Sequence, residues 1–457
     1  MKNDNLLKNT VLLVTGTIIN KGILFIAIPL FSRWLSTEEY GLFDVYTARV
    51  SLIIPVVTIS IGDAVFRFAI DKESINKKAE FITNGLIIEI CSLFLFAIAI
   101  IVFLHSWELA FPFLCYAISE GISIFLLGFL RSLRKLDIYS FSSIFSTCFT
   151  FLFVYVFVKK LRLGLKGMLY GYAIGTMANN IVIMYVTKFC RYILFNKRKF
   201  KIMQSMIKYS FAFVLSNISW WIVNVSDRQI INIFLGASYN GIYAASTKLP
   251  NLITTLTSMF NISWQQTAVD SVKEKQNSIS LNILYNKLCK LFLTSASCGI
   301  ATNYFVFRFF FDYRYYDGQL YMPILIISSM FHGMIFFFTG LNISKKRPEK
   351  NGICVLIGAI INFLLNILFI KRFGLYSVAI STLVSNYIIF KLAQLTVEDV
   401  FIIKYEKLSI LCFFELFMVF ILDKIIISPL IQLLILIFTI LFFLFINRGV
   451  IINKIGI

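Results

Sequence analysis

Apolar residues follow one another in long runs from one end of the chain to the other, and short polar segments separate the runs. Each run has about 20 residues, the length of a helix that crosses a hydrocarbon core roughly 30 Å thick. A membrane barrel would need short alternating strands instead. The pattern therefore predicts fourteen membrane-spanning helices, at residues 10–32, 42–64, 81–103, 110–130, 138–158, 168–187, 209–232, 240–263, 284–306, 321–343, 352–370, 375–395, 408–423 and 428–446.

Composition agrees with an all-α polytopic membrane protein. The 457 residues are 59% hydrophobic, and the mean hydropathy is +0.83. Residues 1–8 are polar, and the apolar run after them is full length, so we expect a retained first helix rather than a cleaved signal peptide. The eight cysteines form no CxxC pair and are expected to be buried apolar residues.

The distribution of Lys and Arg predicts the orientation in the membrane. With the N-terminus placed in the cytoplasm, 28 of the 43 Lys and Arg fall on the cytoplasmic side and ten on the other. This excess predicts that both termini lie in the cytoplasm. The net charge of +20 lies in short loops, so it does not indicate nucleic-acid binding. The outer cluster KKLRLGLK (159–166) departs from the pattern.

Two pairs of similar segments indicate an internal repeat. LSTEEYGLF (35–43) is similar to LGASYNGIY (235–243), and GLKGMLYGYAIGT (164–176) is similar to GLYSVAIST (374–382). Six spans per half make the repeat parallel, about an axis along the membrane normal, as in many transporters. The predicted organisation is an N-terminal lobe at 1–187, a basic cytoplasmic loop at 188–208, a C-terminal lobe at 209–395 and a C-terminal helix pair at 396–457.

Four cations lie inside the repeat-equivalent spans 1, 2, 7 and 8. They are Lys21, Arg49, Arg228 and Lys248. Each would cost about 2.5–3.5 kcal/mol at a helix centre facing lipid, so we expect them to line a water-filled cavity between the lobes. For Arg49, Arg228 and Lys248 the alternative is that the side chain extends to the membrane interface. For Lys21 the alternative is an ion pair with a membrane carboxylate.

Polar residues follow these cations at helical spacing and are expected to line the same cavity. Thr17 shares a face with the cation of span 1. Asn217 and Asn224 do so in span 7, and Asn251 and Thr255 in span 8. In span 2 no comparable row of polar residues shares a helix face with Arg49.

Acidic residues inside the spans are candidates for ion coupling. Glu89, Glu120 and Asp227 are the residues selected for this role, with a structural ion pair as the alternative. Asp63 and Glu415 are interpreted as interfacial. No cofactor is expected, and the coupling ion is left open between H⁺ and Na⁺.

Catalytic motifs do not occur in the sequence. It has no GxxxxGK[ST] phosphate loop and no HExxH, and its two histidines are far apart. No loop is long enough for an extramembrane catalytic domain. The chain is therefore not expected to be an enzyme.

Three segments give the chain its resemblance to a known family. RWLSTEEYGLFDVYTAR (33–49), RSLRKLDIYS (131–140) and DRQIINIFLGASYNGIYAASTKL (227–249) resemble polysaccharide repeat-unit flippases of the multidrug/oligosaccharidyl-lipid/polysaccharide (MOP) exporter superfamily. The resemblance implies two six-helix lobes with two extra C-terminal helices. It also implies a cargo of O-antigen or other surface-polysaccharide units on undecaprenyl diphosphate. A polysaccharide polymerase and a chain-length regulator would be partners.

Other functions remain open at this point. A multidrug or small-cation exporter of the same superfamily should line its cavity with carboxylates, whereas cations predominate here. A flippase for the peptidoglycan precursor lipid II carries a diphosphate too, so charge does not separate it. A membrane polymerase or ligase would need a larger outer loop than FFFDYRYYDGQLY (309–321).

Overall fold

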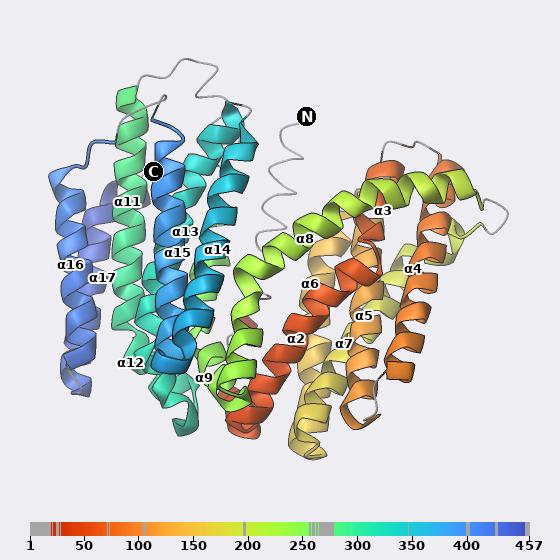
Figure 1. Cartoon of the computed structure of the whole chain (residues 1–457), viewed down its shortest axis with the longest axis horizontal. Coiled ribbons are helices and arrows are strands. Elements are labelled where there is room, and N and C mark those ends of the chain that lie inside the picture. Colours follow the sequence, from red (N-terminus) through yellow and green to blue (C-terminus); the bar gives the residue numbers. More distant parts are fainter. Residues whose placement is uncertain are drawn as a thin grey trace. The chain divides into compact units, whose positions relative to one another are not determined.

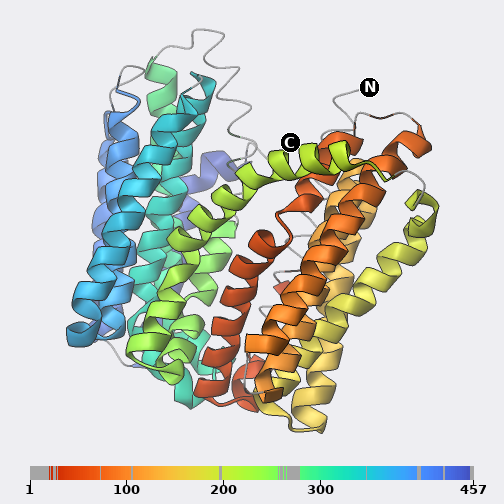
Figure 2. The ribbon, with the colours of Figure 1, turned by 45° about the vertical axis from the view of Figure 1, so that its right-hand side comes forward.

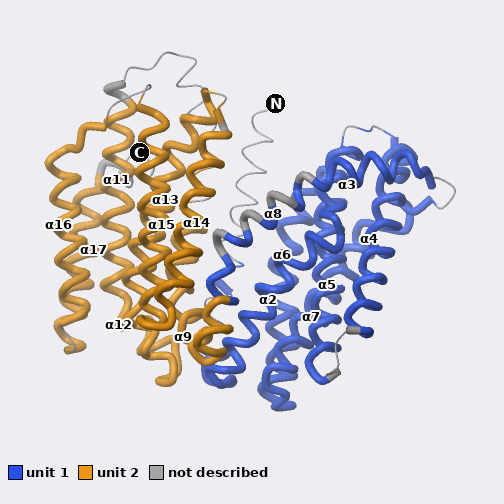
Figure 3. The backbone as a smooth tube through the Cα atoms, in the orientation of Figure 1, with its two compact units in different colours: residues 1–229 blue, residues 230–457 orange. Residues whose placement is uncertain are grey.

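The structure, a computed structural model, describes residues 20, 22–23, 27, 29–70, 72, 74–103, 107–194, 198–255, 257, 261, 264, 278–345, 347–398, 403–425 and 428–452. These residues are helical or lie in turns and connections, and none of them forms a strand. The chain divides into two compact units, residues 1–229 and 230–457 (Figure 3).

Unit 1 is built from long helices that run side by side, with α7 packed against both α5 and α6 (Figures 1 and 2). Its elements are α2 (Thr37–Val57), α3 (Ile61–Ala69), α4 (Ile75–Phe103), α5 (Trp107–Ser132), α6 (Leu136–Val154), the π-helix η1 (Tyr155–Lys160), α7 (Gly164–Thr187), the 3₁₀-helix η2 (Phe189–Tyr192) and most of α8 (Phe200–Phe234).

Unit 2 repeats this packing, with α15 packed against both α13 and α14 (Figure 1). Its elements are α9 (Ala237–Ser246), α11 (Ser278–Ala301), α12 (Asn303–Phe310), the 3₁₀-helix η4 (Tyr313–Leu320), α13 (Met322–Ser344), α14 (Pro348–Phe373), α15 (Leu375–Leu395), α16 (Lys407–Ile425) and α17 (Pro429–Ile452). The C-terminal helices α16 and α17 both pack against α11.

The fold confirms an all-α polytopic membrane protein. Among the described residues, eight helices are long and apolar enough to cross a membrane. They are α2, α4, α5, α6 with η1, α13, α14, α15 and α17. The first predicted span, 10–32, lies mostly outside the described residues.

The internal repeat predicted from the sequence is visible in how equivalent helices begin. Thr37 begins α2 and Ala237 begins α9, each directly after its N-cap residue in the matched segments. Gly164 begins α7 with φ +53°, and Gly374 caps α15 with φ +57°. Glycine adopts a positive φ without the clash that a Cβ would cause. The starts of both helices therefore depend on a glycine at these positions.

Glycines bring the helices of unit 1 close together. A Cβ on Gly175 would lie 2.5 Å from Cα of Thr150, and one on Gly171 would lie 2.8 Å from Cα of Val154. Small residues four apart let membrane helices pack backbone to backbone. The close packing of α7 on α6 therefore depends on this stripe.

The two units do not divide the chain where the predicted lobes do. The boundary between the two compact units falls after Gln229, inside α8. The sequence instead predicts that the loop between the lobes lies at 188–208. The described ends of that loop include η2, and the first 30 residues of α8 belong to unit 1. The predicted lobe boundaries stay a prediction.

Candidate functional site

The second predicted span, 42–64, is not one helix but two, because the backbone breaks between α2 and α3. Ile59 and Ser60 both have left-handed backbones, with φ of +52° and +49°. Pro55 precedes the break by one turn and removes one helical hydrogen bond. A β-branched residue such as Ile59 is strained in this region, and such strain concentrates at functional sites.

Asn217 contacts the break directly. Its Nδ2 donates a hydrogen bond to Oγ of Ser60 at 3.1 Å, and the Ser60 hydroxyl donates to the carbonyl of Pro55 at 3.3 Å. The amide therefore joins α8 to the turn that follows α2. Sequence reasoning selected Asn217 as a polar residue of span 7, and the structure gives it a partner that the sequence did not indicate.

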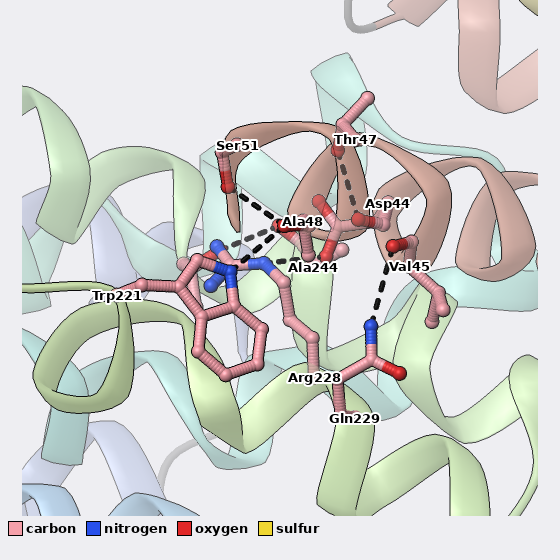
Figure 4. Close-up of polar contacts among 10 residues, drawn as sticks. Asp44, Val45, Thr47, Ala48, Ser51, Trp221, Arg228, Gln229 and Ala244 are labelled. Atoms are coloured by element: carbon pink, nitrogen blue, oxygen red, sulfur yellow. Dashed lines mark hydrogen bonds and ion pairs between the residues drawn. The ribbon is translucent and has the colours of Figure 1, made fainter. Parts of the chain in front are cut away.

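Arg228 forms an ion pair with Asp44 in the α2–α8 contact (Figure 4). Nε of Arg228 lies 2.6 Å from Oδ2 of Asp44, and the two side chains are only 16% and 14% exposed. In a region of low dielectric such a pair interacts far more strongly than at the protein surface. The sequence alone does not indicate this partner for Arg228, because 184 residues separate it from Asp44.

Neighbouring hydrogen bonds hold α8 in register with α2. Nε1 of Trp221 donates to the carbonyl of Ala48 at 2.8 Å, and Nε2 of Gln229 donates to the carbonyl of Val45 at 3.4 Å (Figure 4). Because helix-interior carbonyls already bond within the helix, these are additional contacts to the backbone of α2. They lie on either side of Arg228 in the sequence of α8 and so help to hold it against Asp44 of α2.

Arg49 is exposed on α2. Its guanidinium carbon lies 5.3 Å from the centre of the Tyr46 ring, one turn earlier in the helix. Within the described residues, no carboxylate lies within ion-pair distance of Arg49. Its charge is therefore stacked on an aromatic face, a contact that is stronger where water is excluded.

Lys248 and its neighbours lie in unit 2, in a helical stretch that follows a turn at Thr247. Lys248 is half-buried and Asn251 is exposed. The hydroxyl of Thr255 donates to the backbone carbonyl of Asn251 at 2.7 Å. The predicted stripe of span 8 thus keeps its helical spacing.

Some selected residues fall outside the described part of the chain. They are Lys21 and Thr17, together with the side chain of Asn224. Arg49, Asn217 and Arg228 belong to unit 1, while Lys248, Asn251 and Thr255 belong to unit 2. A common cavity for these residues stays a prediction.

The acids selected for ion coupling are buried to different degrees. Glu89 on α4 is 2% exposed, and its Oε1 has no hydrogen-bond partner among the described residues. Asp227 is 8% exposed, and Glu120 on α5 is half-buried. A carboxylate so far from water needs a proton or a cation, so the ion-coupling hypothesis has its strongest candidate in Glu89.

Two acids interpreted as interfacial have specific partners in the structure. Asp63 on α3 accepts from Arg131 on α5 at 2.8 Å. Glu415 lies in the middle of α16, is 9% exposed, and accepts a short hydrogen bond from Ser297 on α11. The interfacial interpretation of Glu415 is therefore wrong, since the helix runs a further ten residues beyond it.

Unit 2 also contains a buried network of amides and hydroxyls that sequence reasoning did not select. Nδ2 of Asn366 donates to Oδ1 of Asn362 at 3.2 Å, and Oδ1 of Asn366 accepts from Ser381. Asn386 donates to Ser328 at 2.8 Å, which joins α15 to α13. Two asparagines four residues apart in the apolar run 352–370 were the available signal. No group of three or more metal-ligating side chains occurs among the described residues.

Comparisons with known proteins bear on this fold and site. A family model described as "Polysaccharide biosynthesis protein" matches residues 6–269, which is more than half of the chain. No curated protein matches the chain.

Solved structures of membrane transporters match nearly the whole chain. The lipid II flippase MurJ, in an inward closed conformation, has a TM-score of 0.68 and 17% identity over 96% of this chain and 100% of its own. An inward-facing multidrug resistance MATE transporter of the MOP superfamily has a TM-score of 0.66 and 12% identity over 83% of this chain and 95% of its own. A MOP superfamily transporter from Pyrococcus furiosus has a TM-score of 0.56 and 14% identity over 91% and 96%. At these identities the matches show a shared fold.

Proposed function

Since the chain belongs to the polysaccharide biosynthesis protein family, we propose that it is a flippase for lipid-linked oligosaccharides. Its cargo is an O-antigen or other surface-polysaccharide repeat unit on undecaprenyl diphosphate. It moves this cargo from the cytoplasmic to the periplasmic leaflet by alternating access. The MOP transporter fold supports the proposal, since the matched structures include a lipid flippase.

The observation that carries this proposal is the Arg228–Asp44 ion pair, together with Arg49 on the same helix as Asp44. A diphosphate carries negative charge that must cross the low-dielectric part of the membrane, where cations attract it most strongly. A guanidinium has five N–H donors in a planar fork that suits phosphate oxygens. Arg228 binds Asp44 through Nε, so a phosphate group of the cargo would compete with this carboxylate for the guanidinium.

We propose that Lys21, Arg49, Arg228 and Lys248 contact the diphosphate along a cationic central path. Thr17, Asn217, Asn224, Asn251 and Thr255 would supply neutral hydrogen-bonding groups for the sugars on that path. Glu89, Glu120 and Asp227 are the proposed coupling residues, with H⁺ or Na⁺ as the ion. The protein would act in the bacterial inner membrane, with both termini in the cytoplasm, beside the polysaccharide polymerase and the chain-length regulator.

A lipid II flippase is the second candidate function, because a MurJ structure is among the matches. Both cargoes carry a diphosphate, so the cationic residues suit either one. A multidrug exporter is a weaker candidate, although MATE structures match as well. Cationic drugs would be repelled by Arg49 and Arg228, whereas an anionic headgroup is attracted.

The test is complementation in a bacterium that lacks the flippase of a defined surface polysaccharide. The wild-type chain should restore the polysaccharide and remove the lipid-linked repeat units that accumulate on the cytoplasmic side. Lys21→Ala should abolish this restoration, and Lys21→Arg should retain part of it. The proposal fails if the chain instead rescues depletion of the lipid II flippase. If Lys21→Ala restores the polysaccharide as well as wild type, the cavity role proposed for Lys21 is wrong.

A further inference from the structure

A groove of about 490 Å³ lies in unit 2, between α15 and α16. Its floor comes from α11 and α13, which pack against each other. Tyr285 and Cys289 of α11 and Phe331 and Met334 of α13 form this floor, and all four are buried. Every residue that lines the groove belongs to unit 2, so the groove is complete within that unit.

The walls of the groove are aromatic and open toward the outside of the helices. Tyr387 and Phe390 of α15 form one wall, and Phe413, Phe414 and Phe417 of α16 form the other. The three phenylalanines of α16 are 53–66% exposed. The sequence predicts that α16 spans the membrane at 408–423, so we expect these exposed apolar side chains to contact lipid and the groove to be open to hydrocarbon chains.

One end of the groove is cationic. Lys391 lies on α15, four residues before its last residue Leu395, and is exposed. Its Nζ lies 6.0 Å from the centre of the Tyr387 ring and 5.7 Å from that of Phe390. It also donates to Oε1 of Gln394 at 3.4 Å. The ammonium is therefore held over the groove walls by two aromatic faces.

The same end of the groove has a fixed polar rim. Asn286 of α11 is 1% exposed and holds the segment that leads into α16. Its Nδ2 donates to the carbonyl of Lys404 at 2.8 Å, while its Oδ1 accepts from the backbone N–H of Glu406 at 3.0 Å and from the Ser409 hydroxyl at 2.9 Å. These bonds fix Tyr405 at the rim of the groove. They also leave Lys404 and Lys407 exposed beside it.

We propose that this groove binds an anionic phospholipid of the cytoplasmic leaflet. An acyl chain lies along the aromatic walls, and the phosphate lies at the Lys391 end. The chemistry matches at both ends, since basic pockets between membrane helices on the cytoplasmic side bind anionic headgroups. The volume is within the range of ligand pockets.

A resident phospholipid fits this groove better than the cargo does. The cations lie at one end only, as a lipid that stays in one leaflet requires. A diphosphate that crosses the membrane needs positive charge along its path. The bound lipid fills the space between α15 and α16 and so stabilises the contact of the C-terminal helices with the rest of unit 2.

Native mass spectrometry of the purified full-length chain tests this proposal. Phosphatidylglycerol and phosphatidylcholine with identical acyl chains are titrated against the protein. The wild type should retain phosphatidylglycerol preferentially, and Lys391→Ala should lower that retention about fivefold, as expected for one cation near a membrane surface. Lys391→Arg should retain the preference. Lys201→Ala, which removes an exposed lysine of α8 in unit 1, should leave it unchanged.

A second variant tests the groove itself rather than the charge. Ile410→Trp enlarges an exposed wall residue and should reduce retention of both lipids, while thermal unfolding without lipid stays unchanged. Equal retention of the two phospholipids by the wild type would overturn the proposal, and so would an unaltered preference in Lys391→Ala. Preferential displacement of phosphatidylglycerol by undecaprenyl phosphate would assign the groove to the carrier lipid instead. None of these results bears on whether the chain is a flippase.

Discussion

Two regions of the molecule hold polar groups inside membrane helices, and they do so with different chemistry. In unit 1, the α2–α8 contact contains an ion pair between Arg228 and Asp44. In unit 2, the α14–α15 contact uses neutral groups, with Asn366 between Asn362 and Ser381. Asn366 is fully buried, whereas the two ions each keep about a seventh of their side-chain surface exposed.

This difference between an ion pair and a neutral network indicates which region can respond to a charged ligand. A neutral network whose donors and acceptors bond each other needs nothing further, and it fixes how helices pack. An ion pair with residual exposure holds charges for which another ion can compete. The strained break at Ile59 lies nearly three helical turns beyond Arg49 on the same chain segment, so the responsive region also contains a backbone joint. We therefore propose that transport depends on the α2–α8 contact, whereas the neutral network of α13, α14 and α15 serves the packing of the helices.

The largest expected effect comes from breaking the ion pair in two ways. Arg228→Ala leaves Asp44 largely buried without its partner, which should lower the free energy of unfolding by about 3–5 kcal/mol. The double variant Asp44→Leu/Arg228→Met removes both charges and keeps volume, so stability should return to near the wild-type value. Transport should remain lost in the double variant, because the diphosphate no longer has this cation.

Thermal unfolding of the purified protein and surface polysaccharide in a complemented strain measure the two effects separately. A double variant that is stable and transports normally would show that Arg228 serves only the fold. The comparison between a responsive and a structural region would then fail for this residue.

A matched pair of glycine substitutions compares how closely the helices of each unit pack. A Cβ on Gly128 in unit 1 would lie 2.3 Å from the carbonyl oxygen of Gly62, which is backbone and cannot rotate away. A Cβ on Gly358 in unit 2 would lie 2.3 Å from Cγ1 of Ile389, a side chain that can change rotamer. Gly128→Ala should therefore cost about 1–3 kcal/mol, and Gly358→Ala should cost less than about 1 kcal/mol.

Unfolding midpoints of the two variants, measured in the same detergent, give this difference directly. Equal losses would mean that α3 and α5 separate as easily as Ile389 changes rotamer. The close contact at Gly62 would then not constrain unit 1.

The sequence predicts the helical architecture and the repeat because both depend on local chemistry. Apolar runs of membrane length leave helices as the expected structure. The repeated starts at Gly164 and Gly374 follow from glycines that can adopt positive φ. These signals lie within a few residues of the features that they specify, so one sequence is sufficient to find them.

The candidate site is less predictable because its contacts join distant segments. Asp44 and Arg228 each stand out as charges in apolar runs, but nothing in the sequence pairs residues 184 positions apart. The break at Ile59 was missed for a different reason. Its residues are apolar and β-branched, and only Pro55 nearby signals an irregular helix. Tertiary packing determines both features.

Removal of an amide from the neutral network should have a moderate effect on stability alone. Asn366→Leu removes the amide that bonds the Ser381 hydroxyl and the side-chain oxygen Oδ1 of Asn362. The free energy of unfolding should fall by about 1–2 kcal/mol. Leu364→Ala, on an exposed face of the same helix, should change stability by less than about 0.5 kcal/mol. Both variants should retain transport when corrected for protein amount in the membrane. Loss of transport by stable Asn366→Leu would place function in unit 2 as well.

The smallest effect concerns the strained joint of unit 1. Ile59→Gly removes a β-branched side chain from a backbone with φ +52°, a conformation that glycine adopts freely. Ile53→Gly is the matched control, since Ile53 is equally half-buried but lies inside α2, where glycine costs about 1 kcal/mol. The two variants lose a similar apolar side chain, so the difference between their unfolding free energies isolates the backbone. Ile59→Gly should be the more stable of the two by about 1–2 kcal/mol. Equal stability in a thermal unfolding assay would mean that the joint stores no strain.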